Sequence, residues 1–197
     1  MEDMDPGLIS RLNELWRPIY PYLAQWITQW CPTKPYWVLE LGPFSGGISN
    51  LLSGLSRNVR TVCLMPQHGV AQGMRDQFES NVKALVGSLE RLPFMASFDV
   101  VLFRGAFFFL TLEIIREGYR VLKPGAYALL GGGYGPLTPS KEIAKIAEES
   151  KRLNYQLGKK WISRKELAEM VKDAEMERYS EILEEGGLWL LLKKGFL

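Results

Sequence analysis

The 197-residue chain is poor in the side chains that usually build metal and redox sites. It has one histidine and two cysteines, and Cys31 and Cys63 lie far apart in apolar surroundings. Neither cysteine has the spacing of a metal-ligand pair, so we expect no metal site. So few cysteines fit a reduced setting, and the sequence predicts an intracellular, cytoplasmic protein.

The sequence also lacks a large excess of charge of one sign, and it lacks long apolar runs. The formal net charge is +2, from 24 Lys and Arg against 22 Asp and Glu, which is too small to indicate a nucleic-acid partner. No apolar run is long enough to cross a bilayer, and the N-terminal MEDMDPG is acidic and lacks a signal core. With 47% apolar and 23% charged residues, residues 1–197 are expected to form one soluble domain without a membrane partner.

The most organised stretch runs from Trp37 to Leu55 and reads WVLELGPFSGGISNLLSGL. Alternating bulky residues at its start predict a buried strand, with Glu40 near its end. A turn rich in Gly and Ser follows, and then apolar residues recur at helical spacing. The stretch therefore predicts a strand, a glycine loop and a helix, whose first N–H groups carry partial positive charge. Taken alone, the loop also fits an ordinary tight strand-to-helix connection.

Strands and helices alternate along the rest of the chain. Residues 1–32 are expected to form a helical cap, with two helices in residues 8–30 that Pro18 and Pro21 interrupt near Tyr20. Further strands are expected at Val59–Met65, Lys83–Gly87, Phe98–Phe103 and Ala126–Leu130, and then a hairpin of Glu177–Leu183 and Leu188–Lys193. Further helices are expected at Gln67–Asn81, at Thr111–Leu122, from a Thr138 cap to about Leu153, and after a Ser163–Glu166 capping box. Turns are expected at residues 56–58, and Gly131–Gly135 is expected to be a flexible loop.

This alternation predicts an α/β fold with a doubly wound, mostly parallel seven-stranded sheet and a C-terminal antiparallel hairpin, which is Rossmann-like. Ligands of such sheets bind beyond the carboxyl ends of the strands, near the switch point. The segments expected to converge there are 40–46, 65–67, 88–90 and 104–106.

Four blocks of this sequence resemble, in their order and spacing, the class I S-adenosylmethionine-dependent methyltransferases, and in particular the small single-domain group that acts on low-molecular-weight substrates. The blocks are VLELGPFSGG, GSLERLPFMASFDVVLFRGAFFFL, EIIREGYRVLKPGAYALL and ERYSEILEEGGLWLLLKK. The resemblance runs from about Trp37 to the C-terminus. It implies the methyltransferase fold, with residues 131–162 as a variable lid segment.

The resemblance also implies S-adenosyl-L-methionine as the cofactor, and methyl transfer to a small, partly apolar molecule as the reaction. The glycine loop would approach the methionine part of the cofactor, and Glu40 would hold that loop or the amino group. Residues after the second and third strands would meet the ribose and the adenine. The cofactor-binding residues expected on this basis are Glu40, Gly42, Pro43, Phe44, Ser45, Gly46, Met65, Pro66, Gln67, Ser88, Leu89, Arg104 and Gly105.

Three positions depart from the family pattern. Phe44 stands where the family loop usually has glycine, and its ring would crowd a ligand unless it turns away or stacks on the cofactor. The second strand ends without the acid that usually binds the ribose, and Gln67 is the nearest neutral substitute. Ser88 stands near the place where an Asp often meets the adenine.

Two interpretations from different classes therefore stay open. One is an active methyltransferase with an altered grip on its cofactor, and the other is a degenerate member that binds a ligand or partner without catalysis. A nucleotide-dependent oxidoreductase is disfavoured because the loop lacks the full G-x-G-x-x-G.

No residue is a clear catalytic base, so the catalytic residue is left unassigned. His68, at a helix start, is interpreted either as a surface residue, which is favoured, or as a catalytic base. Phe107–Phe109 are interpreted either as core packing or as an apolar substrate wall. Arg104 either meets a carboxylate of the cofactor or substrate, or is solvated or salt-bridged. The acceptor atom and the oligomeric state also stay open.

Overall fold

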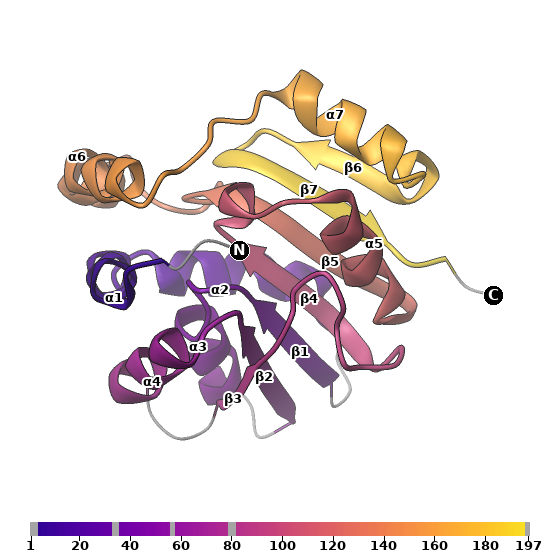
Figure 1. Ribbon diagram of the computed structural model, residues 1–197, viewed down its shortest axis with the longest axis horizontal. Coiled ribbons are helices and arrows are strands. Elements are labelled where there is room, and N and C mark those ends of the chain that lie inside the picture. Colours follow the sequence, from indigo (N-terminus) through magenta and orange to yellow (C-terminus); the bar gives the residue numbers. More distant parts are fainter. Residues whose placement is uncertain (1–3, 33–35, 56–57, 79–81, 196–197) are drawn as a thin grey trace.

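The computed structural model describes residues 4–32, 36–55, 58–78 and 82–195 of the chain. In this part, seven strands form one sheet in the order β3-β2-β1-β4-β5-β7-β6, with helices on both faces (Figure 1). The first five strands are parallel, and β7 runs antiparallel between β5 and β6. The strands are β1 (Tyr36–Leu41), β2 (Val59–Met65), β3 (Lys83–Val86), β4 (Phe98–Arg104), β5 (Leu122–Gly133), β6 (Ser180–Leu183) and β7 (Gly187–Lys193). The predicted doubly wound sheet with its C-terminal hairpin is confirmed.

Two apolar cores lie on opposite faces of the sheet because strand residues alternate between the faces. Val38, Cys63 and Leu102 face the core covered by the first four helices, whereas Leu39, Leu64 and Val101 face the core covered by α5 and α7. The helices are α1 (Pro6–Leu15), α2 (Tyr20–Ile27), α3 (Gly47–Leu55), α4 (His68–Gln77), α5 (Leu112–Arg120), α6 (Ser140–Gln156) and α7 (Arg164–Asp173). Short 3₁₀ turns are η1 (Thr28–Trp30), η2 (Ala106–Phe108) and η3 (Glu177–Tyr179).

The N-terminal helices cover the end of the sheet to which the parallel strands point. Asp5 caps α1 by accepting from the N–H groups of Gly7 and Leu8, and the chain turns between α1 and α2 as the two prolines predict. Figure 1 shows α1 beside α6, and Trp16 Nε1 donates to Ser150 Oγ of α6 at 2.9 Å. The helical cap is thereby joined to the segment that follows β5.

The prediction of a flexible loop at Gly131–Gly135 is wrong for its first three residues. Gly131, Gly132 and Gly133 extend β5 and pair with Trp189, Leu188 and Gly187 of β7. A Cβ at Gly131 would lie 2.5 Å from the carbonyl oxygen of Leu188, so the two strands approach too closely for a side chain. A run of glycines at this point serves strand pairing, which a local reading of the sequence cannot distinguish from a loop.

Three boundaries also differ from expectation. Pro139, and not Thr138, is the N-cap of α6, because the Thr138 hydroxyl donates to the carbonyl of Tyr134 instead. Residues 177–179 form a 3₁₀ turn before β6, so that strand is shorter than expected. The helix expected to reach Asn81 ends at Gln77, and residues 79–81, like residues 56–57, lie outside the described residues. The Ser163 capping box of α7 is confirmed.

The described residues lack two features. No helix there is both long and apolar enough to span a membrane. In the same residues, no three His, Cys, Asp or Glu side chains are grouped as metal ligands.

Candidate functional site

The switch point of the sheet lies between β1 and β4, because the strand order reverses there. The loop after β1 and the residues after β4 meet at this point. The carbonyl oxygen of Phe44 accepts from Arg104 Nη2 at 3.0 Å, and a Cβ at Gly105 would lie 2.5 Å from the Phe44 ring. The structure therefore brings together the parts of the expected site that follow these two strands.

Glu40 holds the glycine loop through hydrogen bonds to its backbone. Its carboxylate is fully buried, and Oε2 accepts from the N–H groups of Gly46 and Ser49, each at 3.0 Å. Inside the loop, Ser45 Oγ donates to the carbonyl of Gly42 at 2.7 Å. These bonds fix the turn from β1 into α3, which is one of the two roles expected for Glu40.

The environment of Glu40 opposes its ionisation. Burial raises the pKa of the Glu40 carboxyl, while the Gly46 and Ser49 hydrogen bonds and the Arg104 charge lower it in part. The buried Cys63 thiol lies 4.0 Å from Oε2, and burial raises the pKa of this thiol well above its ordinary value. The other carboxylate oxygen, Glu40 Oε1, has no hydrogen-bond partner within the described residues.

Arg104 at the end of β4 is buried, with 4% of its surface exposed. Its Nη2 donates to Asn13 Oδ1 at 2.7 Å and to the Tyr20 hydroxyl at 2.9 Å, in addition to the carbonyl of Phe44. These oxygens are neutral and the side chain is buried, so the interpretation of Arg104 as solvated or salt-bridged is wrong. Arg104 instead ties the helical cap to the glycine loop. The other interpretation, a contact with a carboxylate of the cofactor or substrate, stays a prediction.

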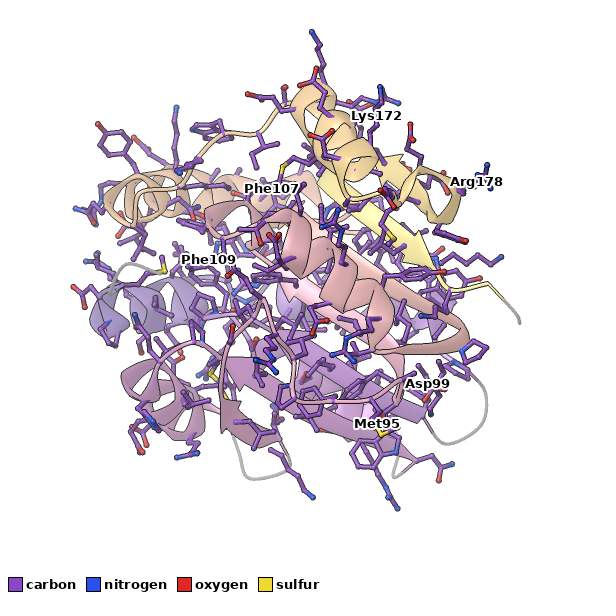
Figure 2. The ribbon with its side chains drawn as sticks, turned by 45° about the vertical axis from the view of Figure 1, so that its right-hand side comes forward. Met95, Asp99, Phe107, Phe109, Lys172 and Arg178 are labelled. Atoms are coloured by element: carbon purple, nitrogen blue, oxygen red, sulfur yellow. The ribbon has the colours of Figure 1, made fainter. Side chains whose placement is uncertain are left out.

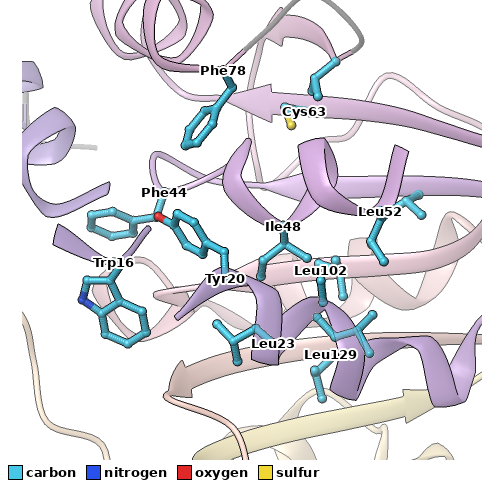
Figure 3. Close-up of a cluster of buried hydrophobic side chains, with 14 of the residues drawn as sticks. Trp16, Tyr20, Leu23, Phe44, Ile48, Leu52, Cys63, Phe78, Leu102 and Leu129 are labelled. Carbon is cyan, nitrogen blue, oxygen red and sulfur yellow. The ribbon is translucent and has the colours of Figure 1, made fainter. Parts of the chain in front are cut away.

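Three aromatic rings surround the Arg104 guanidinium. Its carbon lies 4.9 to 5.2 Å from the ring centres of Trp16, Tyr20 and Phe44, within cation–π range. Figure 3 shows these three rings gathered together beside the buried cluster. Burial raises the pKa of the Tyr20 hydroxyl to about 12, although the Arg104 charge acts in the opposite direction. The hydroxyl therefore stays protonated and also donates to Asn13 Oδ1 at 3.0 Å.

The crevice at the switch point is thus filled by the protein's own side chains. All of residues 41–49 are buried, and Phe44 has 1% of its surface exposed. Five cavities of about 300 to 630 Å³ lie on the described surface, and none of these five is lined by Gly42, Phe44, Met65 or Ser88. The unpartnered Glu40 Oε1 fits the amino end of S-adenosylmethionine, but Phe44 and Arg104 must move before a cofactor can reach it.

The expected residues after β2 and β3 lie further along the same edge of the sheet. Met65 and Leu89 are buried, whereas Pro66 and Gln67 are half-buried and Ser88 is exposed. The carbonyl of Met65 accepts from Gly87 N–H at 3.0 Å, which places the two strand ends side by side. Pro43, also buried, belongs to the loop itself.

One cavity near the crevice lies after β4 and not over the glycine loop. A cavity of about 390 Å³ is lined by Phe107, Phe108 and Phe109, with Glu90 and Lys160 at its polar side. Figure 2 shows Phe107 and Phe109 in the segment that follows β4. Phe107 is buried and the next two rings are half-buried, so the interpretation as core packing is confirmed for Phe107. All three rings also line the cavity, and their role as a substrate wall stays a prediction.

His68 begins α4 and is exposed. It lines a different cavity, of about 610 Å³, together with Met4, Asp5 and Gln67. The position agrees with a surface histidine, and nothing in the described residues pairs it with a nucleophile.

Sequence reasoning missed Asn13 and Tyr20 as members of the site. Both are buried and both contact Arg104. The aromatic stripe of the N-terminal helices was a usable signal, because polar atoms on such a stripe need buried partners. The choice of Arg104 as that partner depends on how α1 and α2 cross the end of β4.

Comparison with known proteins finds a sequence match over part of the chain and a fold match over the whole of it. Residues 39–130 match the sequence model of the methyltransferase domain. No curated protein matches the chain. Solved structures with the same fold include a protein from Methanococcus maripaludis described as an S-adenosylmethionine-dependent methyltransferase. Its TM-score is 0.77 at 21% identity, over 100% of this chain and 96% of that one.

Two further structures agree in fold. A methyltransferase from Haloferax volcanii, solved in complex with a methyltransferase activator, has a TM-score of 0.70 at 16% identity over the whole of both chains. A methyltransferase from Aquifex aeolicus has a TM-score of 0.66 at 17% identity, over 97% of this chain and 98% of that one. The predicted resemblance to the class I S-adenosylmethionine-dependent methyltransferases is therefore confirmed: residues 39–130 match the methyltransferase domain in sequence, and the whole chain has the fold of these solved structures.

Proposed function

We propose that this protein transfers a methyl group from S-adenosylmethionine to a small, partly apolar molecule. The observation that carries the proposal is the buried Glu40 carboxylate, which holds the glycine loop at the switch point of a matched methyltransferase domain. When bound, S-adenosylmethionine supplies a methyl carbon on a sulfonium: the acceptor's lone pair forms the new bond as the carbon–sulfur bond breaks, and its electron pair stays on sulfur. The residues that would hold this cofactor are those expected from the sequence, from Glu40 to Gly46 and along the ends of β2, β3 and β4.

The protein's own contribution is positioning. The cavity walled by Phe107, Phe108 and Phe109 lies directly after β4, where it can hold an apolar part of the acceptor and exclude water. The described residues of the crevice include no free base, so an acceptor would be already nucleophilic or would lose its proton to water. A pH–rate profile that reports an essential enzyme base would contradict this part of the proposal.

Entry of the cofactor requires a movement. Arg104 and Phe44 fill the crevice, and Asn13 and Tyr20 of the helical cap hold Arg104 in place. We propose that residues 1–32 open as a cap and that the segment after Gly133, up to Ile162, acts as the lid of the acceptor site. In this proposal, both segments belong to a single soluble, cytoplasmic domain.

Calorimetry with S-adenosylmethionine and its demethylated product tests the proposal. Binding of both is expected, and no binding at millimolar ligand would overturn it. Gly42→Val is a poor test, because a Cβ there would lie 2.2 Å from the Phe103 ring at a backbone φ of +91° and would disturb folding.

Ser88→Trp is a sharper variant. Ser88 is exposed at the expected adenine end of the site, so a large ring there blocks the ligand and spares the core. Ser97→Trp is the matched control, since Ser97 is an exposed serine of the same loop at the opposite end of the sheet. A strong loss of affinity in the first variant alone supports the proposed pocket, and equal affinity in both places the pocket elsewhere.

A second candidate function is favoured by the filled crevice itself. In that case, the protein is a methyltransferase-fold member that binds a ligand or partner without catalysis, and the Arg104 guanidinium permanently occupies the aromatic cage. This reading expects no S-adenosylmethionine binding by the natural protein. It also expects binding to stay absent when the cap contact is weakened by Asn13→Ala.

A further inference from the structure

A second cavity of about 300 Å³ adjoins the phenylalanine-walled one. It lies between the end of β5, the start of β7 and the C-terminal part of α6, and it shares Phe107, Lys160 and Ile162 with its neighbour. The two cavities therefore lie next to each other at the carboxyl edge of the sheet.

The second cavity combines aromatic rings with positive charge. Trp16, Tyr134 and Trp161 line it together with Lys151, Lys159 and Lys160, and its lining contains no Asp or Glu. Trp16 and Tyr134 stack with their ring centres 4.8 Å apart, so one wall is a rigid aromatic pair. Trp161 is 77% exposed, which leaves its ring available to a ligand.

Helix α6 ends in a way that fixes Lys159 at this cavity. Gly158, with a φ of +75°, donates to the carbonyl of Tyr155, and Lys159 N–H donates to the carbonyl of Asn154. This pair of bonds is the Schellman arrangement that ends a helix and reverses the chain. It places Lys159 Nζ 5.0 Å from the centre of the Trp161 ring.

Lys159 is a half-buried cation with no carboxylate in bonding contact within the described part of the chain. Burial lowers the pKa of its ammonium, and the nearby Arg104 charge lowers it further. A cation in a partly dry site is stabilised by an anion beside it. The arrangement of Lys159, Lys160 and Lys151 around a hollow supplies a place for that anion.

We propose that this cavity binds a planar aromatic molecule that carries a carboxylate, and that such aromatic acids are the class of methyl acceptor. The carboxylate pairs with Lys159, and the ring packs against Trp161 and Phe107. A volume of about 300 Å³ suits a ligand of one or two fused rings. The assignment to the methyl acceptor rests on the proposed function, whereas the binding site does not.

The test is direct binding of 2-naphthoate by calorimetry, without S-adenosylmethionine, alongside the neutral isostere 2-naphthalenemethanol. The acid is expected to bind at least tenfold more tightly than the alcohol, and to quench tryptophan fluorescence. Equal affinities, or no binding of the acid at millimolar concentration, would overturn the proposal. Competition by inorganic phosphate as strong as that by unlabelled 2-naphthoate would overturn the aromatic part.

Lysine variants test which cation pairs with the carboxylate of 2-naphthoate. Lys159→Met is expected to lower the affinity for 2-naphthoate at least tenfold and to leave that for the alcohol unchanged. Lys172→Met, at an exposed lysine of α7 labelled in Figure 2, is the matched control and should bind as the natural protein does. Lys160→Met is a second, more exposed variant with a smaller loss expected, in case Lys159→Met folds poorly. Natural affinity in both Lys159→Met and Lys160→Met would overturn the site.

The two proposals fail separately. Binding of S-adenosylmethionine without lysine-dependent binding of 2-naphthoate leaves the proposed function and removes this site. Lysine-dependent binding of 2-naphthoate without cofactor binding supports the site and removes the methyl acceptor role. Methylation of an aromatic acid that is lost in Lys159→Met supports both.

Discussion

The crevice at the switch point and the cavity beside α6 lie next to each other, but their charged side chains are partnered differently. In the crevice, Glu40 and Arg104 are buried and their hydrogen bonds go to the protein. In the cavity, Lys159 is half-buried and lies over an aromatic ring, and no carboxylate of the described residues is in bonding contact with it or lines this cavity. Buried charges with internal partners hold segments of the fold together, whereas a charge without a counterion is available to a ligand. In the proposals above, the first region therefore holds the structure of the site, and the second selects the acceptor.

The largest effect is expected at Glu40. Glu40→Leu should lower the free energy of unfolding by about 4 kcal/mol, because two buried N–H groups, of Gly46 and Ser49, lose their acceptor. Glu40→Gln keeps an acceptor oxygen and should lose less than half as much. Urea unfolding measures both, and an equal loss in the two variants would show that charge, not hydrogen bonding, holds the loop.

The next largest effect is a loss of folding stability at alkaline pH, to which Tyr20 contributes. The pKa of its hydroxyl is raised from 10.0 to about 12, so between these values the folded protein keeps a proton that the unfolded chain releases. Stability is therefore lost as the pH rises through this window, by about 3 kcal/mol in total. Tyr20→Phe should lack this component when unfolding is followed from pH 9 to 12. A parallel decline in both proteins would contradict the buried, protonated hydroxyl.

Arg104→Met is expected to destabilise the protein by about 2 kcal/mol, since the oxygens of Asn13, Tyr20 and Phe44 lose a charged donor. Arg17→Met is the control, because the Arg17 side chain is 54% exposed and its ion pair with Glu14 lies on the surface. Thermal unfolding of the two variants gives the comparison. A loss no greater than that of the control would mean that the cap is not held through Arg104.

A smaller effect is expected at the end of α6. Gly158→Ala should cost about 1 kcal/mol, because a side chain is strained at a φ of +75° even though a Cβ would meet no atom within 4 Å. Gly54→Ala within α3 is the matched control, since a Cβ there also meets open space, and alanine favours the helix. The first change should lower the unfolding temperature and weaken 2-naphthoate binding, and the second should do neither.

The smallest expected effect is a stabilisation, whereas the changes above destabilise the protein. Lys159→Met should raise the free energy of unfolding by roughly 0.5 kcal/mol, because an apolar side chain replaces a half-buried cation near Arg104. Lys160→Met, at an exposed position, should change it little. Destabilisation by Lys159→Met in urea would mean that Lys159 has an internal role like that of Arg104, and the contrast between the two regions would fail.

Much of the fold follows from local pattern. The strand limits at Val59–Met65 and the capping box at Ser163 agree with the structure, since a run of bulky residues and a cap are both read from neighbours in the chain. The expected site is only partly a local matter. Glu40, Gly42 and Gly46 follow from the motif after the first strand, and Arg104 from its place at the end of β4.

The order of strands and helices, the resemblance to the methyltransferase domain and the edge of the sheet on which ligands are expected could all be read from the chain alone. How that edge is filled depends on tertiary contacts. Arg104 lies among Asn13, Trp16 and Tyr20, residues some ninety positions earlier in the chain, so no local pattern announces the contact. Gly131–Gly133 form a strand because β7 pairs with them. Lys159 becomes a ligand candidate because the end of α6 directs it toward a hollow without carboxylates. Burial and the pairing of charges depend on which distant segments meet, and these are set when the helical cap closes over the sheet.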